Sequence, residues 1–460
     1  MSADGLEQAR RVMGDAGVHP RAVTVFEHYY RELESGATGM IAEADIDPIR
    51  SPTRLVDLEV ETAQMHEALA RTAVIRLNGG LGTSMGMQRA KSLLPVCDGL
   101  TFLDVIVGQV RSVRAAHDVR LPLVFMNSFR TRDDTLQALA AYPDLEVDGL
   151  ASDFVQNREP KLRSDDLTPV RWPADPAMEW CPPGHGDLYT ALEVSGVLDD
   201  LIGAGFRYAT VSNSDNLGAA PDPRIVGWFA GSGAPYAAEV CLRTAADLKG
   251  GHLAVRRSDG RLVLRETAQT SPEDLPAFAD GDRHAYFHTN NLWLDLVAVR
   301  DTLRERDGVL GLPLIRNVKT VDPADPGSPE VVQIETAMGA AVEVFEGATA
   351  LEVPRSRFLP VKTTNDLLLL RSDVYELAAD FTVARVTEQA PLVDLDPEHY
   401  KRIGPFDARF PDGPPSLRAA RSLRVRGDWT FGADVAVVGD AELCDTGEPG
   451  RIADGSRLPH

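Results

Sequence analysis

The stretch from Leu77 to Ser92, LNGGLGTSMGMQRAKS, contains the residues best suited to bind phosphate groups. It carries one lysine, Lys91, and these glycines: Gly79, Gly80, Gly82 and Gly86. Glycine permits positive φ angles and a close approach of the backbone, whose N–H groups can then point at phosphate oxygens. A lysine just beyond the glycines supplies a flexible positive charge. The stretch predicts a nucleotide site, with a glycine-rich turn that binds nothing as the alternative.

Two commoner phosphate-binding motifs do not fit this stretch. The Walker motif requires a lysine directly after its last glycine, whereas residues 87–90 separate Gly86 from Lys91. The dinucleotide fingerprint fails more narrowly, because Met85 stands where its third glycine belongs and Gly86 follows one residue late. These mismatches argue against a P-loop ATPase and against a dinucleotide-binding enzyme.

A strand, helix, strand pattern surrounds the glycines. Residues 72–75 form an apolar, β-branched run typical of a buried strand, residues 101–116 have a helical pattern, and residues 121–126 again resemble a strand. Thr101 and Asp104 are spaced as a capping box at the start of the helix. This βαβ unit indicates an α/β protein with a mainly parallel sheet, whose ligands should bind beyond the carboxyl ends of the strands.

A carboxylate follows a second predicted strand. Residues 208–211 resemble a strand, and the polar turn Ser212–Asn216 after it contains Asp215. Such a turn often only satisfies its own backbone, and the residues alone favour that interpretation. The same holds for His185, Gln156 and Lys362, which in an unfamiliar sequence would be a surface hydrogen-bonding group, a solvated loop residue and a lysine that extends to solvent from apolar neighbours.

Composition limits the classes of function. The 460 residues predict two or three domains. With 47 basic and 69 acidic residues the formal net charge is −22, which argues against nonspecific binding to nucleic acid or to an anionic membrane. The N-terminus lacks a signal-peptide pattern and no run is long enough to cross a bilayer, so we expect a cytoplasmic protein. The cysteines, which show no metal-ligand spacing, are expected to be reduced thiols: Cys97, Cys181, Cys241 and Cys444.

The two ends of the chain differ from its centre. Residues 1 to about 70 have a helical pattern, with Pro20 near a helix start. After about residue 380 the sequence becomes proline-rich and loop-like, and apolar residues then recur every six positions: Val425, Phe431, Val437, Leu443 and, after a gap, Ile452 and Leu458. A period of six is typical of a β-helix, although two alternating strands would also space apolar residues evenly.

Long motifs in fixed order identify a resemblance that covers nearly the whole chain. The motifs are LNGGLGTSMG with Lys91-Ser92, FMNSF (125–129) with Asp133-Asp134, PPGHGDLY (182–189), SNSDNLGA (212–219), TNNLW (289–293) and PRSRFLPVKTTNDLLLL (354–370). Together they resemble the eukaryotic-type UTP–glucose-1-phosphate uridylyltransferases. One departure is Arg89-Ala90, which stands where that family usually has Gly-Pro before the lysine.

The resemblance implies a role for each of several residues. It makes Lys91, Lys362 and Asp215 the catalytic groups, with the two lysines on the nucleotide phosphates and Asp215 on a Mg²⁺ ion. It implies that Gln156 reads uracil, that Gly184 contacts UTP and that Asn213 contacts both substrates. The implied nucleotide-binding set is Leu77, Asn78, Gly79, Gly80, Lys91, Gln156, Gly184, Asn213, Asp215 and Lys362. The implied sugar-phosphate set is His185, Asn213, Asn290, Asn291, Glu335 and Thr336, with the choice between the adjacent asparagines left open.

The resemblance also implies an architecture and an activity. The fold would be a Rossmann-like nucleotidyltransferase of the glycosyltransferase-A-like kind, divided into a helical segment (1–71), a catalytic domain (72–379) and a left-handed β-helix (380–460) that often makes oligomer contacts. The reaction would join MgUTP and glucose 1-phosphate into UDP-glucose and pyrophosphate. A phosphate that is already ionised needs no side-chain nucleophile, in agreement with the lack of a Ser/His/Asp or Cys/His constellation. The alternatives are a pyrophosphorylase for another sugar phosphate, such as that of galactose or N-acetylglucosamine, and a catalytically silent nucleotide-sugar sensor.

Overall fold

One mixed β-sheet of 11 strands forms the centre of the computed structural model, which describes residues 3–244, 247 and 250–458. Its continuous path runs β2 (Thr53–Arg54), β18 (Thr349–Glu352), β12 (Tyr236–Leu242), β15 (Tyr286–Asp295), β11 (Tyr208–Asn213), β3 (Thr72–Asn78), β6 (Leu123–Asn127) and β7 (Asp153–Val155). Beside this path lie β1 (Ile46–Pro48), β13 (His252–Arg256) and β14 (Leu262–Arg265). Along the path every pair is parallel except the two pairs of β15, which runs antiparallel to β11 and β12.

The βαβ unit expected from the sequence is present at the centre of this sheet. Helix α4 (Phe102–His117) connects the parallel strands β3 and β6. Thr101 caps α4 through the expected capping box with Asp104. The register pairs Leu77 with Asn213 and Asn78 with Asn127, so the carboxyl ends of β3, β6 and β11 meet at one edge.

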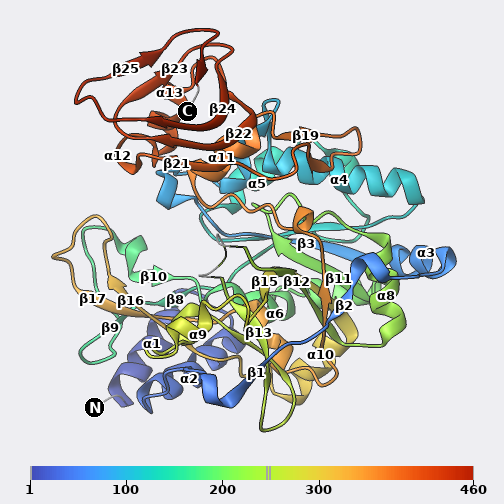
Figure 1. Ribbon diagram of the computed structural model, residues 1–460. Helices are drawn as coiled ribbons and strands as arrows, with labels where there is room; N and C mark the ends of the chain where they lie inside the picture. The colour runs from blue at the N-terminus through green and yellow to red at the C-terminus, as the bar shows by residue number, and fades with distance from the viewer. Residues whose placement is uncertain (1–2, 245–246, 248–249, 459–460) are drawn as a thin grey trace.

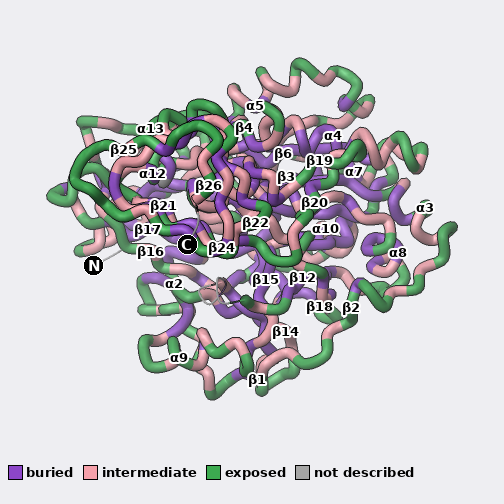
Figure 2. Tube along the Cα trace, turned by 45° about the horizontal axis from the view of Figure 1, so that its top comes forward, coloured by how far each residue is buried: buried purple, intermediate pink, exposed green. Residues whose placement is uncertain are grey.

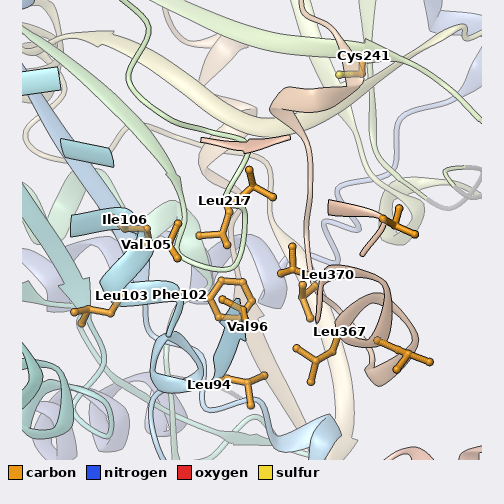
Figure 3. Close-up of a cluster of buried hydrophobic side chains, with 14 of the residues drawn as sticks. Leu94, Val96, Phe102, Leu103, Val105, Ile106, Leu217, Cys241, Leu367 and Leu370 are labelled. Atoms are coloured by element: carbon orange, nitrogen blue, oxygen red, sulfur yellow. The ribbon is translucent and has the colours of Figure 1, made fainter. Parts of the chain in front are cut away.

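Two apolar layers cover the faces of the sheet. Val74 belongs to one core cluster and its neighbours Ala73 and Ile75 to the other, as the two-residue period of a strand requires. The first layer uses α3 (Thr62–Ala70), α4, α8 (Pro223–Ser232) and α11 (Thr364–Arg371), and the second uses α6 (Leu188–Val194), α7 (Val197–Gly203) and α10 (Leu296–Glu305). Figure 2 shows buried backbone in the interior around β3, β6 and β15, with exposed loops at the periphery. In Figure 3, Phe102 of α4 lies among Leu94, Val96, Leu367 and Leu370.

The N-terminal segment is helical only in part. Helices α1 (Ala3–Asp15) and α2 (Pro20–Glu34) were expected, and α2 begins at Pro20. They pack on a small antiparallel sheet of β9 (Leu162–Arg163), β17 (Glu330–Glu335) and β16 (Ile315–Thr320), at the end of the molecule opposite the C-terminal strands in Figure 1. The expectation of helix throughout residues 1–70 is wrong, because β1 and β2 lie within it and join the central sheet.

The C-terminal segment is built from stacked parallel strands. One stack contains β21 (Leu392–Leu395), β22 (Ser416–Val425), β24 (Ala436–Leu443) and β26 (Arg457–Leu458), and a second pairs β23 (Trp429–Phe431) with β25 (Gly450–Ile452). The six-residue pattern is in register between turns: Val425 pairs with Leu443, Phe431 with Ile452 and Val437 with Leu458. The left-handed β-helix itself stays a prediction. Residues 380–415 are less loop-like than expected, since β20 (Val383–Arg385), β21, α12 (Pro397–Tyr400) and α13 (Ile403–Arg409) lie there.

Short elements complete the chain: β4 (Pro95–Cys97), β5 (Leu100–Thr101), α5 (Arg132–Leu139), β8 (Glu159–Pro160), β10 (Trp180–Cys181), α9 (Leu275–Phe278), β19 (Tyr375–Leu377) and several 3₁₀ turns. The core of the C-terminal stack is continuous with the first apolar layer of the sheet, because Val425 and Phe431 belong to the same cluster as Phe102. All the cysteines are free thiols. Within residues 3–244, 247 and 250–458, no helix combines the length and apolar character that a membrane span would need.

Candidate active site

An ion pair joins the glycine-rich loop to the turn after β11. Lys91 Nζ lies 2.5 Å from Asp215 Oδ2 and also donates to the carbonyl oxygen of Val361. The Lys91 and Asp215 side chains are 16% and 22% exposed, so solvent reaches both charged groups. The backbone of Val361 donates to the carbonyl of Asp215 at 3.3 Å. Three segments that are far apart in sequence thus meet at this pair.

The loop that leads to Lys91 has the backbone conformation that its glycines permit. Gly82 and Gly86 have φ angles of 65° and 72°, in the left-handed region. The N–H of Lys91 donates to the carbonyl of Gly80 at 3.0 Å, which fixes the start of the 3₁₀ turn Lys91–Leu93. At Gly86 a Cβ atom would meet the Arg402 side chain at 3.3 Å, so a residue of the C-terminal segment lies directly against this loop.

Asp134 of helix α5 contacts Arg89 and Ala90, the two residues that stand where the family usually has Gly-Pro. The N–H of Ala90 donates to Asp134 Oδ2 at 3.2 Å, and Arg89 Nε lies 3.5 Å from Asp134 Oδ1. A proline at position 90 would have no N–H for the first of these contacts. Asp134, one of the paired acids in the sequence motif after FMNSF, therefore holds both replaced positions.

A second group of residues gathers around Gln156, directly after β7. Gln156 Nε2 donates to the carbonyl of Gly184 at 2.7 Å, and a Cβ atom on Gly79 would lie 3.0 Å from Gln156 Oε1. Gly79, Gln156 and Gly184, all predicted nucleotide ligands, are therefore neighbours. Asn78 differs, because its buried Nδ2 is used by Asn127 and Thr135 at 2.9 and 2.8 Å.

Leu77 and Asn213 lie side by side at the ends of β3 and β11. The carbonyl of Leu77 accepts hydrogen bonds from both the N–H and the hydroxyl of Ser214, so the backbone of Leu77 holds the Asp215 turn. Asn213 is half-buried, and no hydrogen bond of its side chain to another described residue is present. Its amide is thus available to a ligand, whereas Leu77 acts through its backbone.

His185 presents a neutral imidazole beside Thr336. Its Nδ1 accepts a hydrogen bond from the N–H of Met338 at 3.0 Å, which places the ring hydrogen on Nε2. Desolvation of the ring lowers the pKa of His185 from 6.5 to about 4, although the residue as a whole is exposed, so the assignment of a neutral ring depends mainly on the hydrogen bond to Nδ1. Because a proton on Nδ1 would oppose the Met338 N–H, the geometry independently favours the neutral ring. His185 can therefore donate a hydrogen bond through Nε2 at neutral pH.

Glu335 and Thr336 pack against the turn that carries His185. The N–H of Thr336 donates to the carbonyl of Pro183 at 3.0 Å, and the carbonyl of Thr336 accepts from the N–H of Gly186 at 2.8 Å. A Cβ atom on Gly184, whose φ is 79°, would lie 2.5 Å from the carbonyl oxygen of Thr336. Only glycine at 184 allows this approach. Glu335 accepts from Asn317 at 2.9 Å and remains partly exposed.

The structure distinguishes the two adjacent asparagines. Asn291 is 1% exposed, and its amide is fully used by Asn216, Glu239 and the carbonyl of Arg357. Asn290 has a φ of 59°, a rare conformation for a residue other than glycine, at a bulge between β12 and β15. Its Oδ1 is buried without a hydrogen-bond partner, as is Nε2 of nearby His288. Asn290 is therefore the asparagine with free capacity for a ligand.

Lys362 directly follows Val361, whose carbonyl accepts from Lys91, but the Lys362 side chain does not join the Lys91–Asp215 pair. Its backbone N–H donates to Asp366 at 2.9 Å, directly after Val361, and the residue is exposed. Burial raises the pKa of Glu266, and the charge of Lys362 acts in the opposite direction, so this carboxylate is near the ammonium group. Lys91 is thus paired with Asp215 and contacts Val361, whereas Lys362, the residue after Val361, is near Glu266.

The carboxylate of Asp215 is compatible with a magnesium ion. Among the described residues no group of three or more His, Cys, Asp or Glu side chains could hold a metal by itself. Mg²⁺ on a nucleotide commonly uses one or two carboxylates, with phosphate oxygens and water as its other ligands. A single, partly exposed Asp215 beside a predicted phosphate loop fits that pattern.

Sequence reasoning missed a buried network under these residues. Arg357 Nε and Nη2 contact the two carboxylate oxygens of Glu239 at 2.8 and 2.7 Å, and Trp293 and Asn291 donate to the same carboxylate. Burial lowers the pKa of neighbouring Arg76 to about 9, and the charge of Arg357 acts in the same direction. The available signal was a charged residue within an apolar strand, Glu239 in YAAEVCL and Arg76 in TAVIRLN.

Fold and site together define an α/β protein whose sheet edge combines a glycine-rich loop, a lysine–aspartate pair and polar groups suited to a phosphorylated ligand. A family model described as UTP–glucose-1-phosphate uridylyltransferase matches residues 23–437. The chain belongs to this family.

Individual relatives match over nearly the full length. The UTP–glucose-1-phosphate uridylyltransferase of Hordeum vulgare is 36% identical and covers 99% of this chain and 95% of the relative. A UDP-glucose phosphorylase structure from Trypanosoma brucei is 42% identical with a TM-score of 0.91, covering 99% and 98% of the two chains. A mutant UDP-glucose pyrophosphorylase of Leishmania major, in complex with UDP-glucose, is 40% identical with a TM-score of 0.92 and covers 100% and 98%.

Proposed function

We propose that this chain transfers a uridylyl group from UTP to glucose 1-phosphate, releasing pyrophosphate and forming UDP-glucose. The observation that carries the proposal is the Lys91–Asp215 pair beside the glycine-rich loop, in a chain that matches enzymes of this activity over nearly its whole length. A phosphate oxygen of the sugar attacks the α-phosphorus of UTP. The bond from the α-phosphorus to the oxygen bridging to the β-phosphorus breaks, and its electron pair leaves with pyrophosphate.

Charge neutralisation and alignment are the main tasks of the protein in this reaction. We assign Lys91 and Lys362 to the phosphates, because Lys91 Nζ contacts the carbonyl of Val361 and the exposed Lys362 is the next residue in the chain. Asp215 would hold the Mg²⁺ ion, which when bound to the nucleotide neutralises phosphate charge. Lys91 would then exchange its contact with Asp215 for one with a phosphate oxygen. Preorganised charges of this kind usually supply a large part of the rate enhancement.

Recognition of the two halves of the product would involve separate groups. We assign uracil to Gln156, whose amide both donates and accepts, and which lies between Gly79 and Gly184. The sugar phosphate would receive a hydrogen bond from His185 Nε2, with Asn213 between the two substrates. For the sugar hydroxyls we assign Asn290, Glu335 and Thr336, preferring Asn290 to Asn291 because only its amide oxygen lacks an internal partner.

Three further parts of the proposal rest on the sequence and the family. We propose that the chain acts in the cytoplasm and has three domains, residues 1–71, 72–379 and 380–460. We also propose that the parallel strands after residue 380 form a left-handed β-helix through which copies of the chain associate. The register of one periodic apolar residue on the next supports the β-helix.

The test is a coupled assay of pyrophosphate release with UTP and a panel of sugar 1-phosphates. Glucose 1-phosphate should give the highest kcat/KM, whereas preference for the galactose or N-acetylglucosamine compound would correct the substrate. Binding of UDP-glucose without pyrophosphate release would identify a nucleotide-sugar sensor instead. A Gln156→Ala variant should narrow the preference for UTP over other nucleotides, and an unchanged preference would remove Gln156 as the uracil reader.

A further inference from the structure

A single buried carboxylate connects the two proposed recognition segments. Asp187 Oδ2 accepts a hydrogen bond from the backbone N–H of Asn157 at 2.6 Å, and its Oδ1 accepts one from Asn157 Nδ2 at 2.9 Å. Asn157 directly follows Gln156, the proposed uracil reader. Asp187 ends the 3₁₀ turn His185–Asp187, and His185 in this turn is the residue proposed to bind the sugar phosphate. One side chain of the turn therefore holds both the backbone and the side chain of the neighbouring segment.

A second hydrogen bond joins the same two segments. Gln156 Nε2 donates to the carbonyl of Gly184 at 2.7 Å, just before the same turn. The two segments are thus joined by adjacent pairs, Gln156 with Gly184 and Asn157 with Asp187. Because both Asn157 donors use the Asp187 carboxylate, its removal would leave the amide of Gln156 held from one side only.

The surroundings of Asp187 make its carboxylate costly for the folded state. Asp187 is 5% exposed and borders a cavity of about 30 Å³ that Tyr29 of α2 and Glu159 of β8 also line. Glu159 is 3% exposed, and its Oε1 has no hydrogen-bond partner. No salt bridge to Asp187 occurs within the described parts of the chain. An unpaired buried carboxylate destabilises a protein unless hydrogen bonds compensate it.

The charged and titratable groups around Asp187 do not neutralise it. Arg158, beside Asn157, has its guanidinium over the Trp180 ring and donates to the carbonyl of Ala16 instead. The other groups near the turn are acids, phenols or a neutral ring: Glu159 of β8, Glu335 of β17, Tyr29 of α2, Tyr189 of α6 and His185 of the turn itself. The hydrogen bonds from Asn157 are thus the main support of the ionised carboxylate.

We propose that Asp187 is a positioning residue, which through Asn157 keeps the amide of Gln156 in register with the His185 turn, so that the uridine and the sugar phosphate are recognised together. This inference rests on the proposed function for its ligand, UDP-glucose. Asp187 does not touch the substrate in this arrangement. It acts by fixing two segments that do.

The protonation state of Asp187 predicts how UDP-glucose affinity and stability depend on pH. Burial raises the pKa of Asp187 from 3.8 to about 7, while the two hydrogen bonds from Asn157 act in the opposite direction. The ionised form, which only accepts, suits both Asn157 donors. UDP-glucose affinity should therefore increase as pH rises through about 7. Stability has the opposite sign, because a raised carboxyl pKa makes the folded state lose stability as pH rises from the unfolded pKa to about 7.

The experiment compares the full-length wild type with Asp187→Asn, using UDP-glucose binding by calorimetry and urea unfolding between about pH 6 and pH 8.5. UDP-glucose is the suitable probe because its diphosphate does not titrate in this range. The variant should bind about tenfold or more weakly at high pH, as expected when hydrogen bonds to a charged group are lost. Its affinity should no longer vary through pH 7. Its free energy of unfolding at high pH should equal or exceed that of the wild type.

Two further variants make the result specific. Asn157→Ala should reproduce the loss of affinity, and the double variant Asn157→Ala/Asp187→Asn should lose little more, because both changes break the same connection. Glu159→Gln is the matched control, since it removes the other carboxyl of the same cavity without touching Asn157. It should change the pH dependence of stability and leave the affinity within about twofold of the wild type.

The proposal is overturned if Asp187→Asn binds UDP-glucose like the wild type, or if it loses affinity and stability together with the pH dependence of binding intact. Hydrogen exchange of residues 153–160 without ligand separates this failure from that of the proposed function. If the wild type does not bind UDP-glucose, the function is wrong. Faster exchange of this segment in Asp187→Asn would still support the connection, and unchanged exchange would refute it.

Discussion

Two ion pairs near the carboxyl edge of the sheet differ in almost every respect except charge. The Lys91–Asp215 pair is one contact of 2.5 Å between side chains that are 16% and 22% exposed. The Arg357–Glu239 pair is bidentate, and its side chains are 9% and 0% exposed. Trp293 and Asn291 donate the remaining hydrogen bonds to the Glu239 carboxylate. The first pair can exchange either partner for a ligand or for water. The second has no free acceptor, and its Glu239 carboxylate is fully buried.

The difference indicates separate tasks for the two pairs. A buried charge pair is costly to break, because the remaining partner keeps its charge without solvent. The backbone carbonyl of Arg357 also accepts hydrogen bonds from Asn216 Nδ2 and Asn291 Nδ2, in the Asp215 turn and at the bulge of β15. The buried pair therefore sets the positions of these two segments. The partly exposed Lys91–Asp215 pair supplies charge, and its geometry can change during a reaction.

The largest effect on stability is expected from Arg357→Ala. This change leaves the Glu239 carboxylate buried without its cation and should lower the free energy of unfolding by about 3–5 kcal/mol, measured by urea denaturation. The double variant Arg357→Met/Glu239→Gln, in which neither charge remains, should lose less. If the single change lowers the free energy of unfolding by less than about 1 kcal/mol, the contrast between the buried and the partly exposed pair does not hold.

Lys91→Ala should show the reverse pattern, a large loss of activity with little loss of stability. Removal of one charged contact to the reacting phosphates should lower kcat/KM about 10²–10³-fold, equivalent to about 3–4 kcal/mol, in the pyrophosphate assay. The melting temperature should fall by less than in Arg357→Ala, because solvent reaches the Lys91–Asp215 pair and weakens its contribution to stability. Lys401→Ala, at an exposed lysine outside the site, is the control. Full activity in Lys91→Ala would remove this lysine from the mechanism.

Asp215→Asn should alter the metal dependence. Loss of the proposed ligand carboxylate should raise the Mg²⁺ concentration for half-maximal activity about tenfold or more, since even the partners of metal ligands commonly contribute 10–100-fold. Mn²⁺ binding followed by electron paramagnetic resonance gives a reading that does not depend on turnover. A variant with the wild-type metal titration would show that Asp215 is not the ligand.

The smallest effect is expected at Arg89. Its pair with Asp134 is 3.5 Å long, and the Arg89 side chain is 64% exposed, so Arg89→Ala should change stability by at most about 1 kcal/mol. The KM for UTP should move by less than about fivefold, and the difference from the wild type should shrink in high salt. Asp134→Ala should have the larger effect, because it also frees the N–H of Ala90. Equal effects of the two changes would contradict this order.

Local patterns were sufficient for the centre of the fold. The β-branched run at Thr72, the capping box at Thr101 and the polar turn after the strand at 208–211 each depend on neighbours within a few residues. The parallel pairing of β3 and β6 agrees with these local patterns. The mixed α/β sheet is therefore confirmed. The strands β1 and β2 were missed because three and two residues carry no periodicity.

The candidate site was predictable as a list of residues and not as a geometry. The motifs identify which residues belong to the candidate site. Which of these residues contact one another depends on segments that are far apart in the chain. Asn290 and Asn291 are the same residue type in one motif, and only the bulge of β15 separates the free amide from the internally bonded one. The roles of these residues in binding remain predictions. Glu239, Arg357 and Asp187 were missed for the same reason, because burial of a charge has meaning only once its partners are known.

The register of the C-terminal stack limits how this part of the chain can change. Val425 pairs with Leu443 and Val437 with Leu458, so each turn presents its apolar residue directly over that of the turn before. Deleting one residue inside β24 would rotate every later side chain in that strand to the opposite face and expose its apolar residues. Insertions and deletions should therefore be tolerated only at the corners between strands, such as Gly427 and Gly447, where the backbone leaves the ladder.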